Sequence, residues 1–283
     1  MLCRSAVAYL TIPTKVSQGL KNNSDLGVTY MSIYNCKVTD YGDSMHIEYF
    51  HCPIKRTVKE KENTISSVIK KQIINDMKES KDSDKSTMFS VNRSKRNLYH
   101  IARSNKWDFF ITLTFNREDT DASNYDEVSK KVRNWLNNIK KRTSPDFKYI
   151  VVPELHKDGI NYHFHGLIAN IGNLEIFDSG KIDKSGKVIY NLPEWKWGFS
   201  TATKIESNER VTNYLGKYIT KDLMNRLKNK KRYYASQNIF LAPVYEENIN
   251  RDDLYNYFEA DKIKSLKTIG TGFNRITYLE VDK

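Results

Sequence analysis

The clearest secondary-structure pattern in the chain is Trp107-Asp-Phe-Phe-Ile-Thr-Leu-Thr-Phe115. Every second residue from Phe109 to Phe115 is apolar, and the residues between them are Phe110, Thr112 and Thr114. A period of two is that of a β-strand, because successive side chains of a strand point to opposite faces of its sheet. We therefore expect this segment to be a central strand.

The segments that follow this strand have equally regular patterns. Apolar residues recur at steps of three and four from Tyr125 to Arg142, which predicts an amphipathic helix. Residues 148–155 and 162–170 have the composition of two strands, and Asp158-Gly159 between them is typical of a turn. Pro153 cannot donate a ladder hydrogen bond, so we expect regular pairing in the first of these strands to end there.

Weaker patterns complete the prediction of the fold. We expect helices over 97–105 and about 207–227, a hairpin or long loop over 173–192, and a final strand over 275–281. From residue 107 the order is strand, helix, strand, strand, helix. This order predicts an α+β fold in which flanking helices cover a central, mostly antiparallel sheet.

The composition excludes several classes of protein. No apolar run approaches the roughly 18 to 20 residues of a bilayer span, so we expect no membrane protein. The cysteines, Cys3, Cys36 and Cys52, are odd in number and widely spaced, which argues against a disulfide framework and a structural zinc site. The N-terminus has no signal-peptide pattern, and we expect a cytoplasmic protein.

Three of the six histidines, His156, His163 and His165, lie within ten residues. The strand period places His163 and His165 on one face, where two imidazoles can converge on one ion. Glu154 lies on the preceding predicted strand and supplies the carboxylate that a hard divalent cation prefers. The three form a candidate open metal site, with two histidines in ordinary hydrogen bonds as the alternative.

A second group of candidates lies in the segment Tyr214-Leu-Gly-Lys217-Tyr218-Ile-Thr-Lys221. In a continuous helix Tyr214, Tyr218 and Lys221 share one face, with Lys217 beside them. Tyrosine is a poor nucleophile at neutral pH because its pKa is about 10, and a nearby ammonium or metal-bound phosphate stabilises the phenolate. The alternative is an ordinary buried stripe of apolar and tyrosine side chains.

Together, and in this order, these motifs resemble the HUH endonucleases, and among them the rolling-circle replication initiators of small phages and plasmids. Phe110-Ile-Thr-Leu-Thr-Phe115 is similar to the first motif of that family, His163-Phe-His165 to its metal-binding motif and Tyr218-Ile-Thr-Lys221 to its catalytic Tyr-x-x-Lys. Tyr214 matches members with two active-site tyrosines. The resemblance covers roughly residues 93 to 240.

The resemblance implies an RRM-like core that displays two histidines beside a catalytic tyrosine. His163, His165 and a third ligand, for which Glu154 is the candidate, would hold Mg²⁺ or Mn²⁺. Tyr218 would attack single-stranded or hairpin origin DNA and leave a 5′-phosphotyrosine and a free 3′-OH. Tyr214 could make a second attack, with the order of the two tyrosines left open, and Lys221 and Lys217 would stabilise charge. His156 lies outside the motif and is a peripheral residue or an alternative ligand.

The resemblance also implies partners in a bacterial host cell. A host polymerase would extend the 3′-OH. The nearest lookalike of a phosphate-binding loop, residues 180–188, has no Ser or Thr after its lysine, so we expect no fused helicase and assign strand separation to a host helicase or to supercoiling.

The distribution of charge agrees with a DNA partner. The chain has 46 Lys and Arg against 34 Asp and Glu, a formal net charge of +12, for which solubility is the alternative explanation. Residues 204–232 carry nine basic and three acidic side chains. Within this strip we predict backbone contacts and base stacking by Arg226, Lys228, Lys230, Lys231, Arg232, Tyr233 and Tyr234. A solvated helix end explains the lysines almost as well.

Three regions follow from these assignments. Residues 96–240 form the predicted catalytic domain, and 241–283 a C-terminal extension. Residues 1–95 form an N-terminal region of open role, which packs on the core or contacts duplex DNA; its Lys-, Ser- and Asp-rich stretch over 78–86 is predicted to be a loop or linker.

Two other functions remain open at this point. One is an HUH transposase with the same chemistry, which the repeats and genes that flank the coding sequence would identify. The other is a non-catalytic nucleic-acid-binding module of similar α+β build, whose function would survive a chelator.

Overall fold

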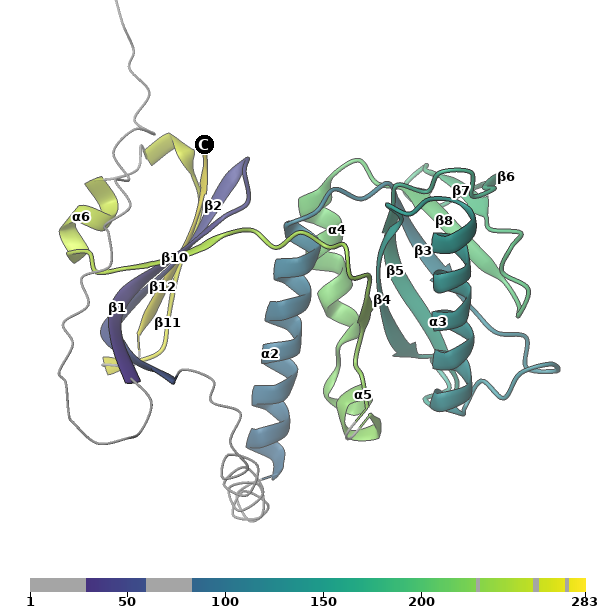
Figure 1. Ribbon diagram of the computed structural model, residues 1–283, viewed down its shortest axis with the longest axis horizontal. Helices are drawn as coiled ribbons and strands as arrows, with labels where there is room; N and C mark the ends of the chain where they lie inside the picture. The colour runs from purple at the N-terminus through teal and green to yellow at the C-terminus, as the bar shows by residue number, and fades with distance from the viewer. Residues whose placement is uncertain (1–28, 60–82, 228–229, 257–259, 273–274) are drawn as a thin grey trace, which may run out of the picture. The chain divides into compact units, whose positions relative to one another are not determined.

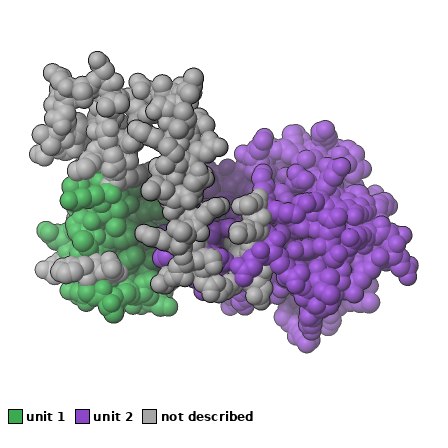
Figure 2. Space-filling model, turned by 90° about the horizontal axis from the view of Figure 1, so that it is seen from below, with its two compact units in different colours: residues 1–76, 244–283 green, residues 77–243 purple. Residues whose placement is uncertain are grey.

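The computed structural model describes residues 29–59, 83–227, 230–256, 260–272 and 275–283 (Figure 1). The chain divides into two compact units, residues 1–76 with 244–283 and residues 77–243 (Figure 2). The predicted boundaries at residues 95 and 240 stay predictions. In the described part of the chain, no helix is both long and apolar enough to cross a membrane.

The first unit holds a five-stranded antiparallel sheet in the order β10-β1-β2-β12-β11. Its core includes Ile47 of β2, Leu279 of β12 and Leu254 of α6, all at most 1% exposed. The predicted final strand is confirmed as β12. The elements are β1 (Thr29–Asp40), β2 (Ser44–Lys59), β10 (Val244–Glu247), α6 (Arg251–Asn256), η3 (Ala260–Lys262), β11 (Ile263–Ile269) and β12 (Ile276–Asp282).

The second unit holds a seven-stranded antiparallel sheet in the order β6-β7-β8-β3-β5-β4-β9, so the predicted central strand, β3, lies at its centre. The predicted α+β class is confirmed. The strands are β3 (Phe109–Leu113), β4 (Lys148–Leu155), β5 (Tyr162–Ala169), β6 (Phe177–Ile182), β7 (Val188–Asn191), β8 (Ser200–Lys204) and β9 (Tyr234–Ala235). The helices are α2 (Ser83–Arg103), α3 (Tyr125–Arg142), α4 (Asn208–Leu215), η2 (Gly216–Tyr218) and α5 (Lys221–Arg226).

Helices cover both faces of this sheet (Figure 1). On one face, Ile111 of β3 and Phe164 of β5 pack with Trp135 and Leu136 of α3. On the other face, Leu167 of β5 packs with residues of α2, α4 and η2. Successive side chains of β3 and β5 therefore enter two separate cores, as the period of two predicts.

Helix α3 begins and ends where the apolar pattern predicts. The Asn124 side chain accepts hydrogen bonds from the backbone N–H groups of Asp126 and Glu127, which satisfies donors that the first turn leaves free. Its buried residues, among them Val132 and Ile139, recur at helical spacing.

The predicted end of pairing at Pro153 is wrong. Strand β4 stays paired with β5 through Leu155, which lies opposite Tyr162. On its other side β4 pairs with β9 only at Ile150 and Val151, so beyond Val151 that side of β4 is a sheet edge, where a residue without an N–H is tolerated.

The predicted helix over about 207–227 is not continuous. Helix α4 ends at Leu215, the 3₁₀ turn η2 follows, and Ile219 is extended. The Thr220 hydroxyl then accepts a hydrogen bond from the Leu223 N–H and begins α5. Glycine at position 216 weakens a continuous helix, and threonine is a good N-cap, so the chain breaks here.

Two other loop predictions have mixed outcomes. Residues 173–192 form the β6–β7 hairpin, one of the two predicted alternatives. Of the predicted loop over 78–86, residues 78–82 lie outside the described residues, and from Ser83 the chain is helical. Polar composition is typical of a loop but also of the solvent face of a helix such as α2.

Gly166 of β5 allows the close approach of β4. A Cβ at this position would lie 2.5 Å from Val151 Cγ1 and 2.7 Å from the Ile150 carbonyl oxygen. We expect Gly166→Ala to destabilise the protein by about 1–3 kcal/mol, because backbone must move to relieve the clash. Thermal unfolding measures the effect. Gly216→Ala is the matched control, since its Cβ would have no neighbour within 4 Å; equal melting temperatures for the two variants would contradict this account.

Candidate metal and tyrosine site

The register of β4 and β5 brings three predicted metal ligands together. Glu154 lies directly opposite His163, and His165 follows on the same face of β5. Glu154 Oε2 lies 2.6 Å from His163 Nε2 and 2.7 Å from His165 Nε2, and the two Nε2 atoms are 3.0 Å apart. All three ligand atoms thus point at one position.

The spacing of these atoms fits a divalent metal ion. Ligands about 2.1 Å from an octahedral ion have neighbours about 3 Å apart, close to the separations of the three atoms. Two imidazoles and one carboxylate also leave coordination positions open for water or substrate. The donor set therefore forms a possible site for a divalent ion.

Charge in the cluster is also suited to metal binding. Burial raises the pKa of Glu154, but hydrogen bonds from His163 and His165 outweigh burial and bring that pKa to about 2. Burial lowers the pKa of His165, and its hydrogen bond to Glu154 offsets this only in part. At neutral pH Glu154 is therefore charged and His165 neutral, the protonation states that metal ligands need.

Thr112 of β3 holds the other side of the His165 ring. It lies opposite His165 in the ladder, and its Oγ1 is 3.0 Å from His165 Nδ1. When Nδ1 donates this hydrogen bond, the lone pair of Nε2 faces the ligand cluster. The sequence analysis placed Thr112 on the less apolar face of its strand but assigned it no role; the period that pairs Thr112 with His165 was the available signal.

Both predicted tyrosines lie beside this cluster. The Tyr218 ring stacks on His165, with centroids 3.9 Å apart and planes at 12°. Tyr214 packs edge-on against Tyr218 at 5.4 Å, and Phe110 of β3 contacts His165, Tyr214 and Tyr218. Although the helix breaks at η2, the motif residues of three chain segments meet at one place.

The two tyrosines differ in exposure and in charge environment. Tyr218 is 7% exposed and Tyr214 45% exposed. Burial raises the pKa of Tyr218, as do the hydrogen bond with Tyr214 and the negative charge of Glu154, so its hydroxyl is protonated at neutral pH. Lys217 Nζ lies 4.9 Å from the centre of the Tyr214 ring. Lys221 is the first residue of α5, and its side chain lies outside the described residues.

His156 lies near the cluster but outside it. Its ring contacts His163 edge-on at 5.3 Å. Only Glu154, His163 and His165 form the group of converging ligand atoms in the described part of the chain. Of the two interpretations offered for His156, the structure favours a peripheral residue.

The predicted DNA-binding strip has several different environments. Lys230 forms an ion pair with Asp126 at 2.7 Å, and Arg232 donates hydrogen bonds to the Ser90 carbonyl and the Ser94 hydroxyl. Arg226 and Lys231 are exposed, and Lys228 lies outside the described residues.

Base stacking by Tyr234 is not possible in this structure, and that prediction is corrected. Tyr234 is 8% exposed, belongs to the core on the α3 face, and its hydroxyl lies 3.1 Å from that of Tyr125. Tyr233 points to the other side of β9 and is partly buried against the opposite core. Adjacent residues of a strand face opposite ways, so the pair could not form one stacking surface.

Comparisons with known proteins agree with part of this picture. Residues 108–223 match a family model described as replication-associated protein ORF2. The matched stretch contains β3, the metal-ligand cluster and both tyrosines, and it supports a role in replication. No curated protein and no solved structure matches the chain.

Removal of the Thr112 hydroxyl tests the metal site. We expect Thr112→Val to weaken Mn²⁺ binding by about 10- to 100-fold, because His165 loses the partner that orients its ring. Isothermal titration calorimetry measures the affinity. Thr201→Val is the matched control, since Thr201 lies opposite Thr112 on the β8 side. The same loss in both variants, or in neither, would argue against this orienting role.

Proposed function

We propose that the protein is a replication initiator of the HUH type with two active-site tyrosines, which nicks and rejoins single-stranded origin DNA. The observation that carries the proposal is the Tyr218 ring stacked on His165, whose Nε2 lies 2.7 Å from Glu154. A nucleophile precursor and a possible metal site are thereby adjacent. The family match at 108–223 favours a replication initiator over a transposase.

The proposed reaction is a transesterification at phosphorus. The Tyr218 oxygen forms a bond to the scissile phosphorus as the bond to the 3′ oxygen breaks. The phenol proton passes to solvent and the 3′ oxygen takes up a proton, so the products are a 5′-phosphotyrosine and a free 3′-OH. The phosphoryl bond energy is kept in the ester, and the reverse attack by a 3′-OH rejoins the strand.

The surrounding residues prepare this step. Glu154, His163 and His165 would hold Mg²⁺ or Mn²⁺, which when bound supplies Lewis-acid polarisation of the phosphate. Phe110 and His165 fix the Tyr218 ring between them. Tyr218 needs such help because burial and Glu154 keep its hydroxyl protonated.

Tyr214 and the two lysines complete the proposed site. The hydrogen bond between Tyr214 and Tyr218 places the second hydroxyl next to the first, where it can make the attack that ends a round. Lys217 and Lys221 would stabilise the phenolate and the phosphate. A host polymerase would extend the 3′-OH, and a host helicase or supercoiling would open the duplex in the bacterial cytoplasm.

Substitution of the tyrosines tests the nucleophile. We expect Tyr218→Phe to reduce formation of the covalent adduct by at least about 10³-fold, since no other group replaces the attacking oxygen. The substrates are single-stranded oligonucleotides tiled across the DNA that flanks the gene, and adducts are detected on denaturing gels. Tyr245→Phe, an exposed tyrosine of β10, is the control. An adduct formed by the double variant Tyr214→Phe with Tyr218→Phe would disprove the assignment.

Metal removal separates a nickase from a passive binding module. We expect EDTA to abolish cleavage and to leave binding of single strands within about threefold, because the backbone contacts are electrostatic. Added Mn²⁺ or Mg²⁺ should restore cleavage to the native chain but not to Glu154→Gln. Glu175→Gln, which alters an exposed carboxylate, should behave like the native chain. Cleavage that persists in EDTA would show that no metal is needed.

A further inference from the structure

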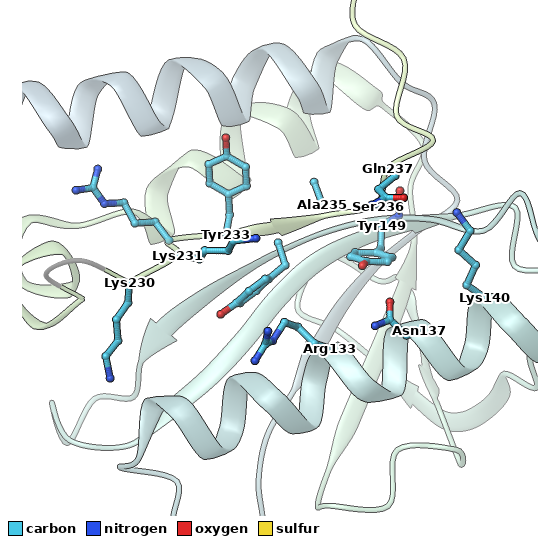
Figure 3. Close-up of a pocket in the computed structure, with 12 residues that line it drawn as sticks. Arg133, Asn137, Lys140, Tyr149, Lys230, Lys231, Tyr233, Ala235, Ser236 and Gln237 are labelled. Carbon is cyan, nitrogen blue, oxygen red and sulfur yellow. Dashed lines mark hydrogen bonds between the residues drawn. The ribbon is translucent and has the colours of Figure 1, made fainter. Parts of the chain in front are cut away.

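A second basic feature lies on the face of the sheet that carries α3. It is a pocket of about 640 Å³ between α3 and the β9 edge. Figure 3 shows Arg133, Asn137 and Lys140 of α3 directed toward Tyr149 and the segment around β9. The sequence analysis did not find it, because its cations come from two segments about 100 residues apart.

This pocket is separate from the metal and tyrosine site. Tyr149 and Tyr234, which line it, belong to the core on the α3 face. His165 and Tyr218 lie on the opposite face, where Tyr218 packs with α2 and α4. The body of the sheet stands between the two places, so no role in the proposed chemistry explains the pocket.

The lining of the pocket has an unbalanced positive charge. It includes five basic side chains and no carboxylate. Two of the five are engaged, Lys230 by Asp126 and Arg232 by Ser90 and Ser94. For the other three, no carboxylate lies within ion-pair distance among the residues that the structure describes; they are Arg133, Lys140 and Lys231.

The arrangement of these groups is partly fixed. Arg133 donates a hydrogen bond from Nε to the Ser129 carbonyl, and its guanidinium carbon lies 5.5 Å from the centre of the Tyr234 ring. Its remaining N–H groups stay free for an anion. Asn137 and Gln237, both exposed, add neutral hydrogen-bond groups beside the cations.

We propose that this pocket is a second nucleic-acid contact, which holds the sugar-phosphate backbone of the DNA on which the protein acts. Arginine and lysine bind phosphates, and amide side chains add contacts that carry no sequence information. Tyr149 and Tyr234 are each 8% exposed, so their rings cannot stack on bases. The pocket is therefore suited to a backbone, independent of sequence. The inference rests on the proposed function for its DNA partner, but not for its charge.

Such a contact has a clear use in a nicking enzyme. Between the two strand-transfer steps the DNA is held only by one ester and by non-covalent contacts. A phosphate contact on the face opposite Tyr218 would retain the DNA flanking the nick without occupying the metal site. The same backbone chemistry is offered by a single strand and by a duplex arm, and the test includes both.

The test compares two variants of the full chain that lose equal charge. The groove variant is Arg133→Gln, Lys140→Ala and Lys231→Ala. The control variant is Lys181→Ala, Lys184→Ala and Lys196→Ala; these lysines are exposed, and the first two lie on the β6–β7 hairpin at the other edge of the sheet. Fluorescence anisotropy in EDTA measures binding of an oligo(dT) strand of about 30 nucleotides, one of about 8 nucleotides and a hairpin duplex, over a salt series. The cleavage assay is run in parallel on short strands.

Each lost phosphate contact should lower the salt slope of log K by about 0.7 for a single strand and about 0.9 for a duplex. We expect the groove variant to bind the long strand or the hairpin at least about tenfold more weakly at about 0.1 M salt, with a slope reduced by about 2 to 3. The control variant should change binding less than about threefold. The arm with the larger loss identifies whether the flanking DNA is single- or double-stranded.

The outcomes separate this inference from the proposed nickase. Cleavage of short strands should continue in the groove variant, because the metal and tyrosine residues are intact. Equal losses of binding in the two variants would overturn the second contact while leaving the nickase in place. Absence of cleavage by the native chain, with the groove effect retained, would overturn the nickase alone. An equal loss for the strand of about 8 nucleotides would place the pocket on the main binding path and also overturn a separate contact.

Discussion

The candidate site depends on one constraint, the pairing of β4 with β5 beyond Pro153. Because the ladder continues to Leu155, Glu154 is held directly opposite His163 instead of entering the turn. Gly166 permits this by leaving room for Val151 and the Ile150 carbonyl where a side chain would clash. The edge position of Pro153 permits it too, since the missing N–H faces a side of β4 that β9 does not reach. Without this register the three ligand atoms would not meet.

The same register is fixed by hydrophobic burial on the far side of the sheet. Phe164 and Ile168 of β5 are completely buried against the α3 face, and each such side chain contributes about 1.5–3 kcal/mol on burial. A slip of one residue would expose them and bury His163 and His165 in their place. The apolar face therefore sets the orientation of the polar one, and the histidines need no favourable interaction with each other to stay where they are. A rigid scaffold of this kind suits a site whose ligands must be held before the ion arrives.

The sequence could predict what depends on local periodicity. Strand β3 and helix α3 have full repeats of their periods, and His163 and His165 share a face by strand geometry alone. The break between Tyr214 and Lys221 escaped the analysis because the apolar spacing there fits a helix, while Gly216 and the Thr220 cap decide otherwise. The pairing of β2 with β12 joins segments more than 200 residues apart and has no local signature. Contacts such as Thr112 with His165 needed the strand order, which periodicity does not give.

The distribution of cations shows why net charge is a poor measure of binding capacity. The surplus between residues 204 and 232 suggested one DNA-binding strip, yet Lys230 is neutralised by Asp126 and Arg232 is turned toward α2. Meanwhile Arg133 and Lys140, from a helix whose charges look like an ordinary solvent face, lie beside Lys231 with no carboxylate partner in the described part of the chain. A phosphate responds to the charges that remain without partners, and these are set by the packing of α3 on the sheet. The electrostatic surface is therefore a property of the fold, and only after folding do the residues that bind an anion differ from those that bind each other.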